Sequence, residues 1–277
     1  MNTVPIGQLK TIDLTPLTGS EVQATPEALT SGKYAAELKS LLQARGVLIF
    51  RGINLTDEQQ LAFSETLGSV VRHGERSPIQ KITLDSKVDQ AAEYLKGSLF
   101  WHIDGTMNRV PIGAAILTSK VLPTWGGNTE FCNTYAAYDA LSAERKQHID
   151  KLRVVHSMWN TQLYYRPEPT LAELEEWMAM GELELPLVWK HRSGRKSLVL
   201  GNTAQYVIGM EPKESAKTLH GLREWATSEP FHYAHVWQLG DAVMWDNTGT
   251  MHRAMPYDFD CGRLLHRTKL AGEEPCD

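Results

Sequence analysis

Apolar side chains repeat at helical spacing over residues 32–45, and Gly46 then ends the pattern. The next four residues, Val47–Phe50, are all apolar, as in a buried strand. Thr56 and Gln59 follow with the spacing of a capping box, in which each residue caps the other at the start of a helix. The early segment from residue 32 is therefore expected to form two helices around a strand.

Short β-like runs begin near Ala114 and continue to the end of the chain. Helical patterns interrupt them over residues 135–152 and 212–227, and a helical insert is expected at about residues 157–186. Later strands are expected at residues 234–238, 243–245 and 264–270. Short strands decorated by helices predict a mainly β fold with a β-sandwich or jelly-roll core, N-terminal helices and a helical insert.

Length and composition favour one domain over residues 1–277. The chain has 277 residues and 42% hydrophobic content, enough to bury a full core, and no linker-like segment divides it. The formal charge of −5 lacks the basic character of a general nucleic-acid binder, so we expect small-molecule partners and no nucleic acid.

The N-terminal residues have neither a basic head nor an apolar run, and no segment approaches about 18 continuous apolar residues. Three cysteines form no paired spacing, which fits reduced thiols better than a disulfide framework. We therefore expect a cytoplasmic protein that does not enter a membrane.

The strongest local signal for metal chemistry is the pair His102 and Asp104 in the segment of residues 101–106. Residues two apart on an extended segment point to the same face, so these two side chains are able to bind one ion. A His-X-Asp pattern also arises by chance. The pair needs a third ligand before it indicates a site.

His252 is the best candidate for that third ligand, although alone it also fits a hydrogen-bonded histidine beside a turn. It follows Asp246, Asn247 and Gly249, whose turn chemistry predicts a turn between two strands. Two imidazoles and one carboxylate are the ligand set of non-haem Fe(II) oxygenases and leave three coordination positions open. A structural zinc site more often fills its coordination sphere with protein groups, typically cysteines.

A row of cations follows on the last predicted strand. Arg263, Leu265, Arg267 and Lys269 would share one face by the alternation of side chains along a strand. Such a face is either solvated or turned into the barrel. In the second case a guanidinium would hold a carboxylate through a bidentate, charge-assisted pair.

These segments together resemble the taurine/aryloxyalkanoate group of 2-oxoglutarate-dependent dioxygenases. The resemblance covers roughly residues 48–272, and the part from His235 onward looks closest to the aryloxyalkanoate branch. The matching segments are residues 101–104, 126–129, 135–141, 240–247, 252–254 and 263.

That resemblance implies a double-stranded β-helix of the jelly-roll, clavaminate synthase-like type. It also implies that His102, Asp104 and His252 bind Fe(II), and that 2-oxoglutarate chelates the metal. Arg263 would bind the distal carboxylate of 2-oxoglutarate, with Thr129 as its hydroxyl partner. The expected reaction oxidises a small organic substrate with O2, normally by hydroxylation, and releases succinate and CO2; desaturation or cyclisation stays open.

Arg267 lies where relatives that accept carboxylates or sulfonates place an anion-binding residue, so the resemblance implies an anionic substrate. His73 and Ser98 are weaker candidates for the substrate pocket, and both also fit ordinary loop positions. Two alternatives remain at this point: a non-catalytic iron or small-ligand sensor on the same fold, and an Fe(II) oxygenase that does not use 2-oxoglutarate. A homo-oligomer is expected because look-alike enzymes commonly form one.

Overall fold

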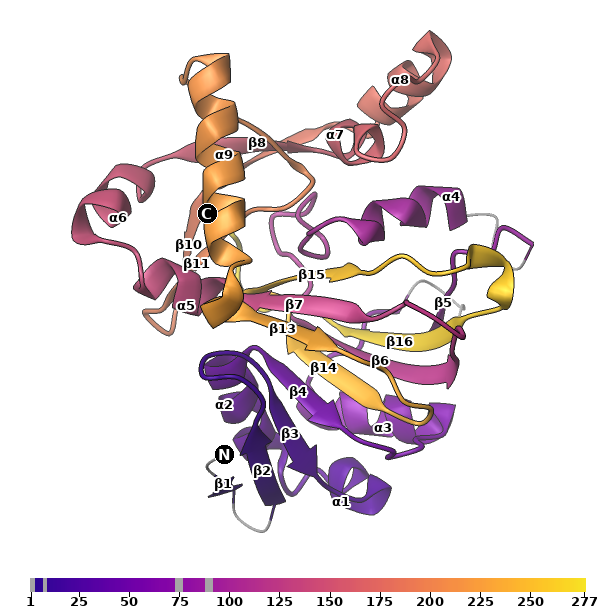
Figure 1. The fold of residues 1–277 in the computed structure, drawn as a ribbon. Coiled ribbons are helices and arrows are strands. Elements are labelled where there is room, and N and C mark those ends of the chain that lie inside the picture. Colours follow the sequence, from indigo (N-terminus) through magenta and orange to yellow (C-terminus); the bar gives the residue numbers. More distant parts are fainter. Residues whose placement is uncertain (1–2, 7–8, 73–76, 88–91) are drawn as a thin grey trace.

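An eight-stranded sheet is the largest element of the computed structural model, which describes residues 3–6, 9–72, 77–87 and 92–277 (Figure 1). Neighbouring strands run antiparallel, except that β3 and β4 run parallel. Their order across the sheet is β1 (Thr3–Ile6), β2 (Leu9–Asp13), β3 (Ser20–Gln23), β4 (Val47–Phe50), β14 (Ala242–Asp246), β6 (Ala114–Val121), β16 (Leu264–Leu270) and β5 (Gln80–Ile82).

A smaller antiparallel sheet faces the large one. It consists of β13 (His232–His235), β7 (Thr129–Asn133) and β15 (Thr250–Ala254), in that order. Buried side chains from both sheets form one apolar cluster between them. The cluster includes Val47, Ile49, Val243, Trp245 and Leu265 from the large sheet and Phe131 and Tyr233 from the small one. Two sheets around a shared core confirm the predicted jelly roll.

The outer face of the large sheet is covered by three N-terminal helices, two of which were predicted (Figure 1). They are α1 (Pro26–Thr30), α2 (Ala35–Arg45) and α3 (Asp57–Leu67). At the start of α3, the Thr56 hydroxyl accepts from the Gln59 amide and the Gln59 side chain accepts from the Thr56 amide, which confirms the capping box. The short helix α1 was not predicted, because five residues are too few for a clear helical period.

A long excursion between β7 and β13 covers the outer face of the small sheet. Its side chains pack with Cys132 and Met251, which point outward from β7 and β15. The elements are α5 (Thr134–Asp139), α6 (Ala143–Ile149), β8 (Arg153–Ser157), α7 (Met158–Leu163), α8 (Leu171–Met178), β9 (Glu182–Pro186), β10 (Val188–Lys190), β11 (Lys196–Leu198), β12 (Ala204–Val207) and α9 (Pro212–Ala226). None of the helices among the described residues is both long and apolar enough to cross a membrane.

Two of the predicted elements end earlier than expected. The single helix expected at residues 135–152 is two helices, because Ser142 caps a new helix with its hydroxyl. The strand expected at residues 234–238 ends at His235. Beyond it the chain turns back, and the Asp241 carboxylate stabilises the turn by accepting from the Gln238 amide at 3.0 Å.

Gly249, in the turn before β15, lies against the ring of Tyr135. A Cβ atom at this position would lie 1.7 Å from Cε2 of that ring, so Gly249→Ala is expected to lower the free energy of unfolding by about 1–3 kcal/mol, the usual cost of overpacking. Gly221→Ala in α9 meets no atom within 4 Å and should raise it by roughly 0.5–1 kcal/mol. Urea denaturation of both variants tests this, and equal stabilities would contradict it.

Candidate metal centre

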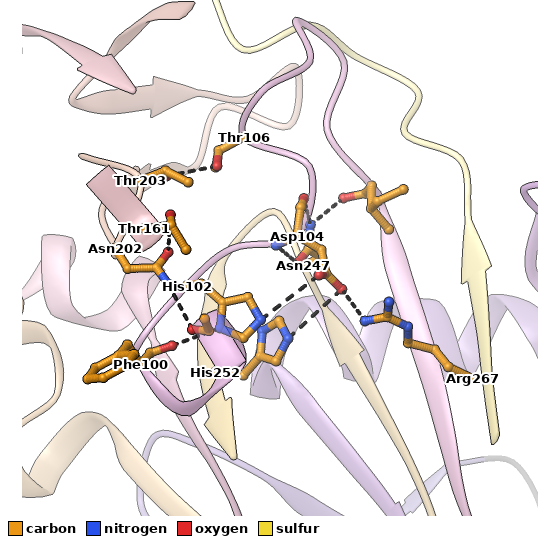
Figure 2. Close-up of polar contacts among 12 residues, drawn as sticks. Phe100, His102, Asp104, Thr106, Thr161, Asn202, Thr203, Asn247, His252 and Arg267 are labelled. Atoms are coloured by element: carbon orange, nitrogen blue, oxygen red, sulfur yellow. Dashed lines mark hydrogen bonds and ion pairs between the residues drawn. The ribbon is translucent and has the colours of Figure 1, made fainter. Parts of the chain in front are cut away.

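His102, Asp104 and His252 point toward one another at one side of the barrel (Figure 2). Their ligand atoms all lie within 4.8 Å of each other, and no other group of three such residues was found in the described part of the chain. An Asp104 carboxylate oxygen lies 4.0 Å from Nε2 of His102, and the other lies 3.9 Å from Nε2 of His252. The three residues thus offer two imidazoles and one carboxylate to a single ion.

Backbone pairing brings the two histidines together. The His102 amide donates to the His252 carbonyl at 3.0 Å, and the His252 amide donates to the His102 carbonyl at 2.9 Å. This antiparallel bridge adds residue 102 to the edge of β15. The rings of Phe131 and Trp245 pack beside His252, with centroids 6.2 and 4.7 Å from its own, and limit its rotation.

The protonation states suit a metal ligand set. Nδ1 of His102 lies 2.9 Å from the Phe100 carbonyl, so Nδ1 carries the proton and Nε2 is left free to coordinate. Burial lowers the pKa of both His102 and His252, which keeps them neutral. Burial opposes ionisation of Asp104, but Arg267 and the two imidazoles outweigh it and lower its pKa.

Asn247 fixes the backbone on which Asp104 is carried. Its amide nitrogen donates to the carbonyls of Asp104 and Ile112, each at 2.8 Å, and its amide oxygen accepts from the Asp104 amide at 2.9 Å. The side chain is fully buried. The sequence indicated Asn247 only as a turn residue, since its partners are distant along the chain.

Arg263 is 2% exposed and lies just before β16. Its guanidinium donates to the Gly127 carbonyl at 2.9 Å and stacks over the ring of Tyr257 at 4.7 Å. Its Nε has no hydrogen-bond partner, and no carboxylate among the described residues forms an ion pair with it. A buried guanidinium without an anionic partner destabilises the folded protein unless a ligand supplies the anion.

Gly127 and Thr129 form the wall beside that guanidinium. Gly127 has a φ of +69°, and a Cβ there would lie 3.0 Å from Nε of Arg263, so only glycine allows this close approach. Thr129, two residues on, is buried, and its hydroxyl accepts from Nε1 of Trp237 at 3.0 Å. No local pattern in the sequence indicated that Trp237 would contact Thr129.

Arg267 faces the three predicted ligands rather than solvent (Figure 2). One Nη donates to Asp104 at 3.1 Å, while Nε and the other Nη donate to Gln80 at 3.3 and 3.2 Å. Leu265, two residues earlier, is buried in the cluster between the sheets. The face shared by Arg263, Arg267 and Lys269 therefore points inward, and a solvated cationic face is excluded.

The two weaker pocket candidates stay predictions. His73 lies outside the described residues. Ser98 is half-buried in a 3-10 helix, η1 (Lys96–Leu99), which lies against β15. Its position near the strand of His252 is compatible with a pocket wall.

A jelly roll that carries two histidines and one carboxylate on one side defines the class of mononuclear non-haem iron enzymes. The chain belongs to the TauD/TfdA dioxygenase family, because the family model described as "Taurine catabolism dioxygenase TauD, TfdA family" matches residues 10–269. It is accordingly an Fe(II)- and 2-oxoglutarate-dependent dioxygenase, and the predicted family resemblance is confirmed.

Similar proteins support this assignment over nearly the whole chain. The (S)-phenoxypropionate/alpha-ketoglutarate-dioxygenase of Sphingobium herbicidovorans is 33% identical, over 94% of this chain and 95% of that protein. The alpha-ketoglutarate-dependent 2,4-dichlorophenoxyacetate dioxygenase of Cupriavidus pinatubonensis is 34% identical, over 87% of this chain and 89% of that protein. A crystal structure of AAD-2 in complex with Mn(II) and N-oxalylglycine superposes with a TM-score of 0.87 at 29% identity, over 97% of this chain and 99% of that one. These likenesses give no support to a non-catalytic sensor.

Outer partners of metal ligands tune metal affinity, so Asn247→Ala is expected to weaken Fe(II) binding by about 10- to 100-fold. The substitution removes both hydrogen bonds that hold the Asp104 backbone and the one to the Ile112 carbonyl. Asn108→Ala is the matched control, because Asn108 donates to Gly105 in the same loop but is exposed. Equilibrium titration of Fe(II) into each variant measures the effect, and equal affinities for both would contradict it.

Proposed function

We propose that His102, Asp104 and His252 hold the Fe(II) ion and that Arg263, with Thr129, binds the distal carboxylate of 2-oxoglutarate. The substrate is a small organic acid whose carboxylate or sulfonate is held near Arg267. The observation that carries this proposal is the buried guanidinium of Arg263, which has no carboxylate partner among the described residues and lies on the inward face that also carries Arg267.

The three metal ligands leave part of the coordination sphere to the reactants. When bound, Fe(II) supplies the activation of O2, coupled to oxidative decarboxylation of 2-oxoglutarate to succinate and CO2. The protein's own contribution is to present neutral Nε2 atoms and an ionised carboxylate without further rearrangement of protons. Asp104 takes the position that a halide would need, which favours hydroxylation over halogenation.

Arg263 suits the distal end of 2-oxoglutarate. Its stacking on Tyr257 and its bond to the Gly127 carbonyl fix the plane of the guanidinium, so the fork is already oriented for a carboxylate. Burial makes the pairing stronger than it would be in water. The hydroxyl of Thr129 accepts from Trp237 and keeps its own proton available for the same carboxylate.

Arg267 suits the anionic group of the substrate because it lies 3.1 Å from a carboxylate oxygen of Asp104, beside the reacting centre. Two of the similar proteins bear names that identify aryloxyalkanoates, phenoxypropionate and 2,4-dichlorophenoxyacetate, as their substrates. An aryloxyalkanoic acid is accordingly the first substrate to test. Hydroxylation of its carbon next to the ether oxygen would give an unstable hemiacetal-type product.

The same proposal covers the domain organisation, the oligomeric state and the cellular location of the enzyme. We infer a single dioxygenase domain over residues 1–277, with the helical insert at about residues 157–186, and a cytoplasmic homo-oligomer. His73 and Ser98 are placed at the substrate pocket. Size-exclusion chromatography with light scattering tests the oligomeric state directly.

Turnover is tested by succinate release from the purified chain with Fe(II), 2-oxoglutarate and O2. The panel contains aryloxyalkanoic acids, amino acids, sulfonates and neutral metabolites, and Asp104→Ala serves as the inactive control. We expect one class of organic acids to raise succinate release above the substrate-free rate, with matching loss of the acid. A panel in which neutral metabolites stimulate and acids do not would refute the anionic substrate.

A further inference from the structure

Lys269 is a second inward-facing cation on β16, two residues beyond Arg267. It pairs in register with Ala115 on β6, as Arg267 pairs with Leu117, so both cations stand on the same face of the large sheet. Leu265, on the same face, is buried between the sheets. The alternation of side chains along the strand therefore directs Lys269 into the barrel, beside the three metal-binding residues.

The two cations differ in their partners. Arg267 already donates to Asp104 and, twice, to Gln80. The side-chain ammonium of Lys269 forms no hydrogen bond or ion pair with any residue that the structure describes, although the residue is half-buried. Burial, with a further contribution from Arg267, lowers the pKa of Lys269 to about 8, and the opposing effect of Asp104 does not offset it.

The charges around the centre do not balance without a substrate. The inward face of β16 and the residue before it supply three cations, Arg263, Arg267 and Lys269, whereas Asp104 is the only carboxylate among the described residues that interacts with any of them. The two charges of Fe(II) are cancelled by those of 2-oxoglutarate. Two positive charges are therefore left for the substrate to offset, and unbalanced buried charge is costly.

We propose that Lys269 forms, with Arg267, a two-cation subsite for the anionic group of the substrate, and that this subsite favours a dianionic group over a monoanionic group of the same shape. The inference rests on the proposed function and deepens it, because it assigns a specificity residue and a charge to the substrate. Lys269 acts here by direct contact with the substrate anion rather than through the metal ligands.

Two probes of equal shape and different charge test the subsite. Phenoxymethylphosphonate as its dianion and phenoxymethanesulfonate as its monoanion are titrated by calorimetry into the full chain loaded with Mn(II) and 2-oxoglutarate, where no turnover occurs. We expect the wild-type protein to bind the phosphonate more tightly. Lys269→Met should weaken phosphonate binding by roughly 10- to 100-fold, the usual effect of losing a hydrogen bond to a charged group, and sulfonate binding by less.

Lys81→Met is the matched control, because Lys81 is an exposed lysine of β5 in the same sheet and pairs in register with His266. It should leave both affinities unchanged, and Lys269→Arg should retain the preference for the phosphonate. The inference is overturned if the loaded wild-type protein binds neither probe, prefers the sulfonate, or shows the same preference after Lys269→Met. Failure of the wild-type protein to bind 2-oxoglutarate at all would instead overturn the proposed function.

Discussion

Asp104→Ala is expected to abolish succinate release and to weaken Fe(II) binding by more than about 100-fold. Loss of an outer partner of a metal ligand costs about 10- to 100-fold in affinity, and Asp104 is itself the only anionic ligand of the three. The imidazoles of His102 and His252 would remain, but two neutral ligands hold a divalent ion far less firmly. Equilibrium Fe(II) titration measures the loss.

The fold is expected to survive this substitution. Asp104 lies outside the apolar clusters that unite the two sheets and their covering helices. Its removal leaves Arg267 with the Gln80 side chain as a partner. Urea unfolding should therefore stay cooperative, and Asp139→Ala, which removes an exposed carboxylate on α5, controls for the loss of a charge. Wild-type iron affinity in Asp104→Ala would refute its role as a ligand.

Arg263→Ala should raise the dissociation constant for 2-oxoglutarate by a factor of about 10 to 100, the equivalent of ~1.5–3 kcal/mol for a hydrogen bond to a charged group. The buried site magnifies the loss, because water cannot replace the guanidinium there. Fe(II) affinity should not change, since Arg263 contacts Gly127 and Tyr257 rather than the metal-binding residues. Binding is measured by titrating 2-oxoglutarate into the Fe(II)-loaded protein without oxygen.

Arg263→Lys separates charge from geometry in the same assay. Lysine keeps the positive charge but loses the planar fork that grips both carboxylate oxygens, so its affinity for 2-oxoglutarate should lie between those of the wild type and Arg263→Ala. An unchanged affinity in Arg263→Ala would assign the cosubstrate role to Arg267 instead.

Local patterns were sufficient for the elements that carry the site. The strand predicted at residues 264–270 is β16, and alternation along it and the residue before it placed Arg263, Arg267 and Lys269 on one face. The period-two argument also brought His102 and Asp104 together, although the segment is a single bridge followed by a turn rather than a strand. Both results follow from backbone geometry that acts over a few residues.

Contacts between distant segments could not be predicted from such local patterns. The pairing of His102 with His252 depends on how β15 meets a loop far away in the chain. Local patterns made His252 a candidate third ligand, and the family resemblance then implied that it binds the same ion. The roles of Asn247 and Trp237 depend on partners in other segments of the chain. The residues next to them in the sequence do not indicate those partners. The direction of the Arg267 side chain was open for the same reason, since a cationic strand face suits solvent and a buried anion equally well.

Anaerobic addition of 2-oxoglutarate to the Fe(II)-loaded protein tests most directly whether the three side chains and Arg263 form one working centre. Chelation of Fe(II) by the keto acid produces a weak visible charge-transfer band. We expect the wild-type protein to develop this band and Asp104→Ala to lack it, with Arg263→Ala requiring more 2-oxoglutarate to reach it. A wild-type protein that binds Fe(II) yet develops no band at saturating 2-oxoglutarate would contradict the account.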